Sequence, residues 1–252
     1  MERQASRVNN TFYDDLGESW YEGGSHPIAL LRAENALRNP WIIEKMRLMG
    51  SPSLDVLDIG CGAGFLTNAL AKEGHRVTGI DLSEKSLHVA KTKDVSQTVQ
   101  YLRLDASSLP FSSQSFDAIF AMDFLEHIEN PKQIVQKVAS LLKPGGLFFF
   151  HTFNRNLLSW LFVIKGVEWC VPNTPKNMHI YSYFIKPSEL RKWCEESGLV
   201  IQEICGLCPR IGSKAFWRSL LKRKISDDFT FKFSSSLATG YIGVAHRIRP
   251  LA

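Results

Sequence analysis

The segment that most constrains the fold is a short apolar run followed by three closely spaced glycines. Leu54–Ile59 has the length and composition of a buried parallel strand, and helical spacing resumes over Phe65–Ala71. The intervening glycines, which let the backbone turn tightly under a ligand, are Gly60, Gly62 and Gly64. A second apolar run ends at Asp81, about 20 residues further on, where a carboxylate can bind both hydroxyls of a ribose. The segment predicts a strand, loop and helix that bind a nucleoside.

The glycine spacing distinguishes two kinds of nucleotide-binding loop. A dinucleotide loop has the pattern Gly-x-Gly-x-x-Gly, because a pyrophosphate lies on the helix N-terminus. Here the pattern is Gly-x-Gly-x-Gly, within Asp58-Ile-Gly-Cys-Gly-Ala-Gly64. It resembles the first motif of the class I S-adenosylmethionine-dependent methyltransferases. The resemblance implies S-adenosylmethionine as cofactor, with its amino-acid part along the loop; the alternative is a glycine-rich turn that binds no ligand.

Strands and helices alternate along the rest of the chain, which predicts a parallel sheet. The further strands expected are Arg76–Ile80, Val99–Leu102, Phe116–Ala121, Leu147–Phe150, Leu199–Ile204 and Tyr241–His246. The further helices expected are Pro27–Arg38, Trp41–Met49, Glu84–Lys93, Pro131–Leu142 and Pro187–Ser197. Pro40 is expected to interrupt the helical lead-in, because proline removes a backbone donor.

Combined with the resemblance, this pattern predicts an α/β, Rossmann-like class I methyltransferase fold. Its sheet is expected to be mostly parallel and seven-stranded, with helices on both faces and an inserted helical lid. We expect one domain over residues 1–252, a length that can bury a substantial core. Its expected parts are a helical lead-in (1–50), a cofactor-binding core (51–152), a lid or interfacial insertion (153–183) and a C-terminal part that completes the sheet (184–252).

Cysteine usage and apolar runs suggest a cytoplasmic protein. Five irregularly spaced cysteines make no disulfide framework, and Cys205 and Cys208 lack a second pair at metal-ligand spacing. Residues 1–13 have neither a secretory core nor the Arg-rich character of a transit peptide. The apolar run Trp160–Ile164 is far shorter than the roughly 20 residues of a membrane-spanning helix.

Residues just after the parallel strands are the candidate ligand contacts, because the crevice of such a sheet lies beyond the carboxyl ends of its strands. Besides the glycine loop these are Asp81 with Leu82, Asp105 with Ala106, and Met122. The methyltransferase class implies that Asp105 lies near the adenine and that Met122 packs on its ring. For Met122, ordinary core filling is an equally good interpretation.

A second group of polar residues follows Met122. If a helical turn begins there, Asp123, Glu126 and His127 share one face. Two carboxylates and an imidazole are suited to a divalent cation such as Mg²⁺, or to general-base work on a substrate hydroxyl. The alternative is an acidic first turn that complements a helix dipole, with His127 exposed at its edge.

Longer motifs narrow the resemblance to one family. They are Asn35-Ala-Leu-Arg38, Met122-Asp-Phe-Leu-Glu-His127, Lys143-Pro-Gly-Gly146, Thr152-Phe-Asn-Arg-Asn156, Gly166-Val-Glu168, Pro175-Lys176, His179 and Phe184-Ile-Lys-Pro-x-Glu-Leu190. Together they resemble the O-methyltransferases of ubiquinone biosynthesis, over most of the chain. The resemblance makes Arg38, Gly60, Asp81 and Met122 cofactor contacts, with Arg38 binding the methionine carboxylate through its planar guanidinium.

The implied reaction is methyl transfer from the sulfonium to a phenolic oxygen of a polyprenylated quinone precursor. Asp123, Glu126 and His127 fall on the family's divalent-metal positions, where the family usually has Glu-x-x-Glu-His, so Asp123 shortens one ligand arm. Glu126 or His127 is a candidate base, and His151 and His179 are further catalytic candidates. His151 stands where the family tends to have serine, and Ile180 where an acid is common. Alternatives are a methyltransferase for another small phenol or lipid, and a non-catalytic cofactor-binding scaffold subunit.

A polyprenyl substrate gives two further segments a possible meaning. Residues 156–183 carry apolar and aromatic side chains typical of a lid or an interfacial element, although a helical cap on the sheet is the alternative. Residues 210–224 hold six bases and no acid, in a chain of formal net charge +5. We expect peripheral contact with an anionic membrane, at its inner face, through both segments. Nucleic-acid binding is not expected, and a quinone-biosynthesis complex is a further candidate partner.

Overall fold

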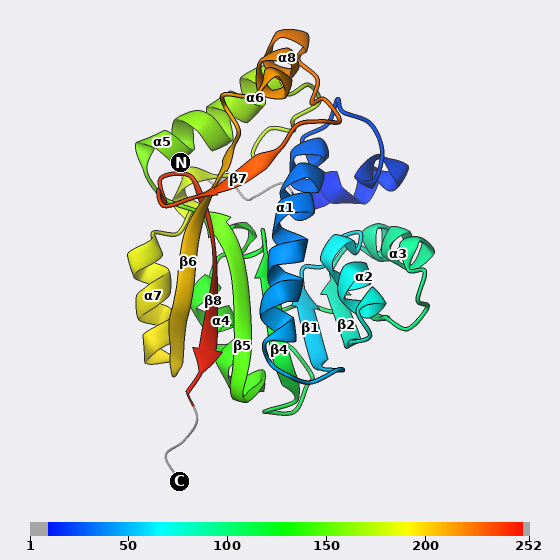
Figure 1. Ribbon diagram of the computed structural model, residues 1–252, viewed down its shortest axis with the longest axis vertical. Helices are drawn as coiled ribbons and strands as arrows, with labels where there is room; N and C mark the ends of the chain where they lie inside the picture. Colours follow the sequence, from blue (N-terminus) through cyan, green and yellow to red (C-terminus); the bar gives the residue numbers. More distant parts are fainter. Residues whose placement is uncertain (1–9, 249–252) are drawn as a thin grey trace, which may run out of the picture.

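The computed structural model describes residues 10–248, and an eight-stranded sheet runs through this part of the chain (Figure 1). Its strands are β1 (Asp55–Ile59), β2 (Arg76–Asp81), β3 (Gln100–Arg103), β4 (Phe116–Met122), β5 (Leu142–Phe153), β6 (Leu199–Pro209), β7 (Phe231–Ser234) and β8 (Gly240–Arg247). They lie in the order β3-β2-β1-β4-β5-β8-β6-β7. Pairs among β1 to β5 are parallel, whereas β8 is antiparallel to β5 and β6, and β7 is antiparallel to β6.

The strand order places the ligand crevice. From β1 the chain moves outward through β2 to β3 and then returns to the other side of β1 for β4. Ligands of such sheets bind where the direction reverses, outside the carboxyl ends of the strands. The loop after β1 and the turn after β4 meet at that point, and these are the two segments that the sequence singles out.

Helices cover both faces of the sheet. They are α1 (Ile28–Arg47), α2 (Phe65–Lys72), α3 (Glu84–Lys93), α4 (Pro131–Leu141), α7 (Pro187–Glu196) and α8 (Lys214–Lys222). Short 3-10 turns are η1 (Asn10–Asp15), η2 (Gly17–Trp20), η3 (Leu125–His127) and η5 (Tyr181–Tyr183). One face carries α1 and α2, with Ile42 and Leu70 packed against Phe120. The opposite face carries α4 and α7, with Val138 and Leu190 in the larger core cluster.

The first helix corrects one expectation. Pro40 does not interrupt it, because α1 runs unbroken from Ile28 to Arg47 with Pro40 inside. Ile42 and Met46, beyond the proline, are fully buried against the sheet. Their packing outweighs the roughly 3 kcal/mol by which proline disfavours a helix interior.

The fold class is confirmed, but the strand number is eight rather than seven. The additional strand is β7, whose four residues Phe-Lys-Phe-Ser are too short for their alternation to stand out in the sequence. β5 is also longer than predicted, since it includes the Lys-Pro-Gly-Gly segment and reaches Phe153. The extension places His151 inside a paired strand, opposite Met122 and Ile242.

The inserted segment is helical over residues 157–170, as α5 (Leu157–Ser159), a π-helical stretch η4 (Trp160–Gly166) and α6 (Val167–Cys170). These helices and α8 lie together beyond the end of the sheet (Figure 1). None of the described helices is long and apolar enough to cross a membrane. The five cysteines are all free thiols. Residues 1–9 of the expected lead-in and 249–252 of the C-terminal part lie outside the described residues, and the division into parts stays a prediction.

Candidate cofactor and substrate site

The glycine loop turns as predicted, with positive φ at Gly60 (72°), Gly62 (52°) and Gly64 (84°). The amides of Gly60 and Cys61 both donate to the carbonyl of Ile80, at 2.9 and 3.0 Å. A Cβ on Gly60 would lie 2.4 Å from the Phe124 ring, and one on Gly62 would lie 3.0 Å from the Trp20 ring. The loop therefore needs glycine for its conformation and for the close approach of aromatic rings.

A cleft of about 760 Å³ opens over this loop. Every predicted cofactor residue except Gly64 lines it: Arg38, Gly60, Gly62, Asp81, Leu82, Asp105, Ala106 and Met122. Gly64 is the N-cap of α2, where a Cβ would lie 2.6 Å from the hydroxyl of Tyr101, so the position requires glycine; its cofactor role stays a prediction. Met122 lines the cleft and also packs on the core beneath it, so the two interpretations of this residue are compatible.

Asp81 is held in place by backbone amides. Gly62 donates to Oδ2 at 2.9 Å and Ser83 donates to Oδ1 at 2.8 Å. A carboxylate has about four acceptor positions, so both oxygens can still accept from a ligand. Burial raises the pKa of Asp81 above its usual value, against the effect of these amides. The arrangement suits a ribose, whose two hydroxyls are neutral donors.

Asp58, Tyr13 and Trp20 are among the residues that line the cleft but were not identified from the sequence. Asp58, at the end of β1, is buried and accepts the hydroxyl of Thr67 at 2.7 Å; burial raises its pKa to about 7. Its place just before the glycines could have identified it. Tyr13 and Trp20 come from the N-terminal turns and stack at a centroid distance of 5.6 Å beside the loop. No sequence pattern points to these aromatic residues.

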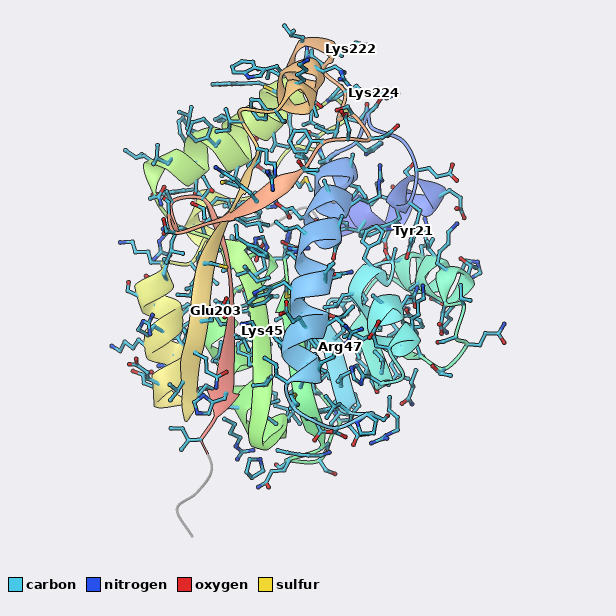
Figure 2. All side chains as sticks on the ribbon, viewed as in Figure 1. Tyr21, Lys45, Arg47, Glu203, Lys222 and Lys224 are labelled. Atoms are coloured by element: carbon cyan, nitrogen blue, oxygen red, sulfur yellow. The ribbon has the colours of Figure 1, made fainter. Side chains whose placement is uncertain are left out.

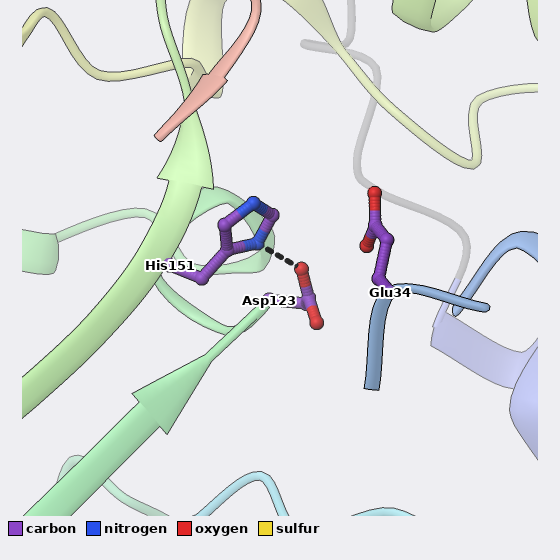
Figure 3. A group of neighbouring side chains, drawn as sticks. All are labelled: Glu34, Asp123 and His151. Carbon is purple, nitrogen blue, oxygen red and sulfur yellow. Dashed lines mark hydrogen bonds and ion pairs between the residues drawn. The ribbon is translucent and has the colours of Figure 1, made fainter. Parts of the chain in front are cut away.

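At the other end of the cleft, a buried network surrounds Arg38, which is 1% exposed. Its guanidinium lies 2.6 Å from Asp123 Oδ2, 3.0 Å from His151 Nδ1 and 3.6 Å from Glu34 Oε2. His151 Nδ1 also contacts Asp123 Oδ1, the bond drawn in Figure 3. Arg38 Nε has no hydrogen-bond partner among the described residues. The resemblance predicted only the cofactor role of Arg38, not this network.

Charges in the network shift pKa values in opposite directions. Burial disfavours the charged form of Asp123, but Arg38 and His151 outweigh burial and hold its pKa well below the usual range. Burial raises the pKa of Glu34 to about 8, against the effect of Arg38. At neutral pH the Asp123 carboxylate is therefore the anion that balances Arg38.

Glu126 and His127 follow in η3, but they do not converge with Asp123 on one point. Glu126 is 1% exposed, accepts the hydroxyl of Thr152 at 2.8 Å and does not line the cleft. Burial, with a further contribution from Asp123, raises its pKa to about 8. His127 does line the cleft, and its Nδ1 has no partner among the described residues. Burial lowers the pKa of His127 to about 4, so its imidazole is neutral at physiological pH.

His179 lies beside His127, outside the cleft lining. The two rings are 5.6 Å apart, and His179 also packs on Phe153 at 5.1 Å. Burial, with a contribution from His127, lowers the pKa of His179 to about 3. His151 is fully buried in β5 and does not line the cleft either. Of the four predicted catalytic residues, His127 alone reaches the cleft surface.

The predicted metal residues do not fit a divalent cation. Among the described residues, three ligand atoms come within 4.8 Å of one another at Glu34, Asp123 and His151, a set that excludes Glu126 and His127. The guanidinium of Arg38 lies against all three of these side chains. The positively charged guanidinium of Arg38 therefore already occupies the position where these three side chains converge.

Comparison with known proteins shows which family the chain belongs to. Residues 57–150 match the family described as a methyltransferase domain. The chain is 39% identical over 199 residues to a ubiquinone biosynthesis O-methyltransferase of Coxiella burnetii, covering 77% of this chain and 82% of that protein. It is 34% identical over 230 residues to the ubiquinone biosynthesis O-methyltransferase of Histophilus somni, covering 88% and 93%. This chain belongs to the ubiquinone biosynthesis O-methyltransferase family.

The fold of this family member agrees with solved methyltransferase structures. Magnesium protoporphyrin IX methyltransferase from Synechocystis PCC 6803, solved with bound SAH, superposes with a TM-score of 0.65 at 21% identity, covering 95% of each chain. The predictions of a methyltransferase fold and of an S-adenosylmethionine-dependent enzyme are confirmed. The roles of single residues in this ubiquinone biosynthesis O-methyltransferase stay predictions.

Proposed function

We propose that this chain transfers a methyl group from S-adenosylmethionine to a phenolic hydroxyl of a polyprenylated quinone precursor. The observation that carries the proposal is one continuous cleft, with Asp81 at one end and the Asp123 and His127 turn at the other. The names of the relatives support the substrate class. The chemistry of the cleft supports a cofactor bound at one end and an acceptor at the other.

The residues present fit the cofactor. Asp81 accepts from the ribose hydroxyls, and Asp105 and Ala106, which line the same end, contact the adenine. Arg38 donates from its unpartnered Nε to the methionine carboxylate, while one terminal nitrogen stays on Asp123 and the other stays beside His151 and Glu34. When bound, S-adenosylmethionine supplies an electrophilic methyl group. Binding at these three points fixes the direction in which that methyl faces.

His127 faces the acceptor. Its neutral imidazole, which lines the cleft, accepts the hydrogen bond of the phenolic hydroxyl. Glu126 is less suited, because its raised pKa keeps it protonated at neutral pH and it does not reach the cleft. His179 packs behind His127 and orients its ring. Alignment of donor and acceptor in this way is worth about 7–11 kcal/mol of the barrier in well-oriented systems.

The test is transfer of labelled methyl to a short-chain prenylated catechol, with a matched ring whose hydroxyls are already methylated as control. The proposal predicts transfer to the catechol alone, and about 10²-fold slower transfer by the His127→Gln variant. SAH affinity should be unchanged in that variant. Tight SAH binding without transfer to the catechol would contradict the substrate assignment, and full activity of His127→Gln would remove His127 from the reaction.

The second part of the proposal is contact with an anionic membrane surface, which gives the enzyme access to a lipid substrate. The end of the molecule formed by α5, η4, α6 and α8 exposes large apolar side chains, here called the cap surface: Leu157, Leu158, Phe162, Trp169, Trp217 and Leu221. Arg223 donates to the carbonyl of Trp169 at 3.0 Å, which ties α8 to α6. Lys222 and Lys224 extend from the same end (Figure 2). Apolar side chains beside bases are typical of interfacial helices.

Vesicle sedimentation tests the membrane contact. We expect binding to vesicles that contain anionic lipid and weaker binding to purely zwitterionic ones. Charge reversal of Lys222 and Lys224 to Glu should lower the anionic preference, since each base contributes about 1 kcal/mol near such a surface. The matched control reverses Lys72 and Lys91, exposed bases on α2 and α3. Equal binding by both double variants would contradict the role of α8.

A further inference from the structure

Asp123 is fixed from three directions. Its φ of 53° is unusual for a residue other than glycine, and its amide donates to the carbonyl of His151 at 3.1 Å. Its Oδ1 contacts His151 Nδ1, and its Oδ2 lies 2.6 Å from Arg38. Backbone and both carboxylate oxygens are therefore committed within the chain. Strained backbone held in this way is common at functional sites.

The His151 imidazole and the Arg38 guanidinium contact the two oxygens of the Asp123 carboxylate, so this carboxylate needs no further cation. Figure 3 shows Glu34 across the network from the bond between His151 and Asp123. Arg38 lies between these groups and carries a full positive charge with 1% exposure. A divalent cation at Asp123 would displace this guanidinium and leave it buried without its anion, which is strongly unfavourable.

The imidazole of His151 reaches across from β5 to the carboxylate of Asp123 directly. One oxygen of that carboxylate is therefore already bonded to a protein group.

We propose that this chain carries out methyl transfer without a divalent cation, because Arg38 fills the cation position and His151 holds Asp123 against it. The proposal rests on the proposed function for the reaction itself. His151 is a positioning residue that acts through Asp123 on Arg38. By keeping Asp123 on one terminal nitrogen of the guanidinium, it leaves Arg38 Nε without a partner among the described residues and available to the cofactor carboxylate.

The first test is calorimetric titration of the wild-type protein, freed of metal with EDTA, with Mg²⁺ alone and with Zn²⁺ alone. We expect no stoichiometric binding of either ion at Asp123, and methyl transfer that EDTA changes by less than twofold. Stoichiometric binding that Asp123→Asn abolishes would overturn the proposal, as would transfer that EDTA abolishes and Mg²⁺ restores. A protein without any transfer would refute the proposed function, and the titration would still decide the cation question.

The second test compares His151→Asn with His151→Ser. The asparagine amide can donate to Asp123 in place of the imidazole Nδ1–H, whereas serine is too short to do so. We expect His151→Ser to raise the KM for S-adenosylmethionine and the Kd for SAH about tenfold, and His151→Asn to restore both within about threefold. Unfolding midpoints identify loss of fold. Equal affinities of the wild type and of folded His151→Ser would overturn the positioning role.

Discussion

Replacement of Asp81 by asparagine tests the ribose assignment quantitatively. Two of the acceptor positions of Asp81 are taken by the amides of Gly62 and Ser83, which leaves about two for a ligand. Asparagine keeps one side-chain oxygen, so the substitution removes one ribose hydrogen bond to a charged group, which contributes about 1.5–3 kcal/mol. This corresponds to SAH affinity lower by about 10- to 10²-fold.

The assay is isothermal titration with SAH, together with thermal unfolding of the free protein. Asp94→Asn is a matched control, because Asp94 also accepts two backbone amides, from Ser96 at 3.0 Å and from Val99 at 3.2 Å, but does not line the cleft. We expect the control to keep wild-type affinity. An Asp81→Asn variant that binds SAH within threefold of the wild type would refute the reasoning.

Three further substitutions test the packing and the electrostatics. Gly64→Ala should lower the free energy of unfolding by about 1–3 kcal/mol, since φ is 84° and the new Cβ would lie 2.6 Å from the hydroxyl of Tyr101; an unchanged urea midpoint would contradict this. Pro40→Ala should stabilise the protein by up to about 3 kcal/mol, because α1 is already continuous through this position, and a lower Tm would argue against that account. Burial raises the pKa of Asp58 from 3.8 to about 7, so its contribution to stability is complete below pH 3.8 and is lost as the pH rises through 7. In the free protein, Asp58→Asn should therefore weaken the fall in stability between pH 4 and pH 7, and an unchanged slope would count against the burial argument.

Local sequence signals predicted the cofactor half of the site. The strand, glycine loop and helix predicted from Leu54 to Ala71 follow from short-range spacing, and Asp81 was predicted from its place at the end of the next strand. Pro40 was interpreted wrongly because the packing of Ile42 and Met46 on a distant sheet decides the outcome. Local propensity alone carries no information about that packing.

The network around Arg38 depends on contacts that are remote in the sequence. Arg38 lies in α1, Asp123 follows β4 and His151 lies in β5, so their network appears only when the three elements are assembled. The sequence placed Asp123 with its neighbours Glu126 and His127 by assuming a helical turn. In the structure Asp123 has a left-handed conformation and turns toward β5 instead, which accounts for the difference.

A crystal structure with bound SAH tests the central claim most directly. The account predicts the ribose on Asp81, the methionine carboxylate on Arg38 Nε, and the sulfur facing the side of the cleft that His127 lines, with no metal ion at Asp123. SAH bound elsewhere, or bound with its sulfur facing away from His127, would contradict the account.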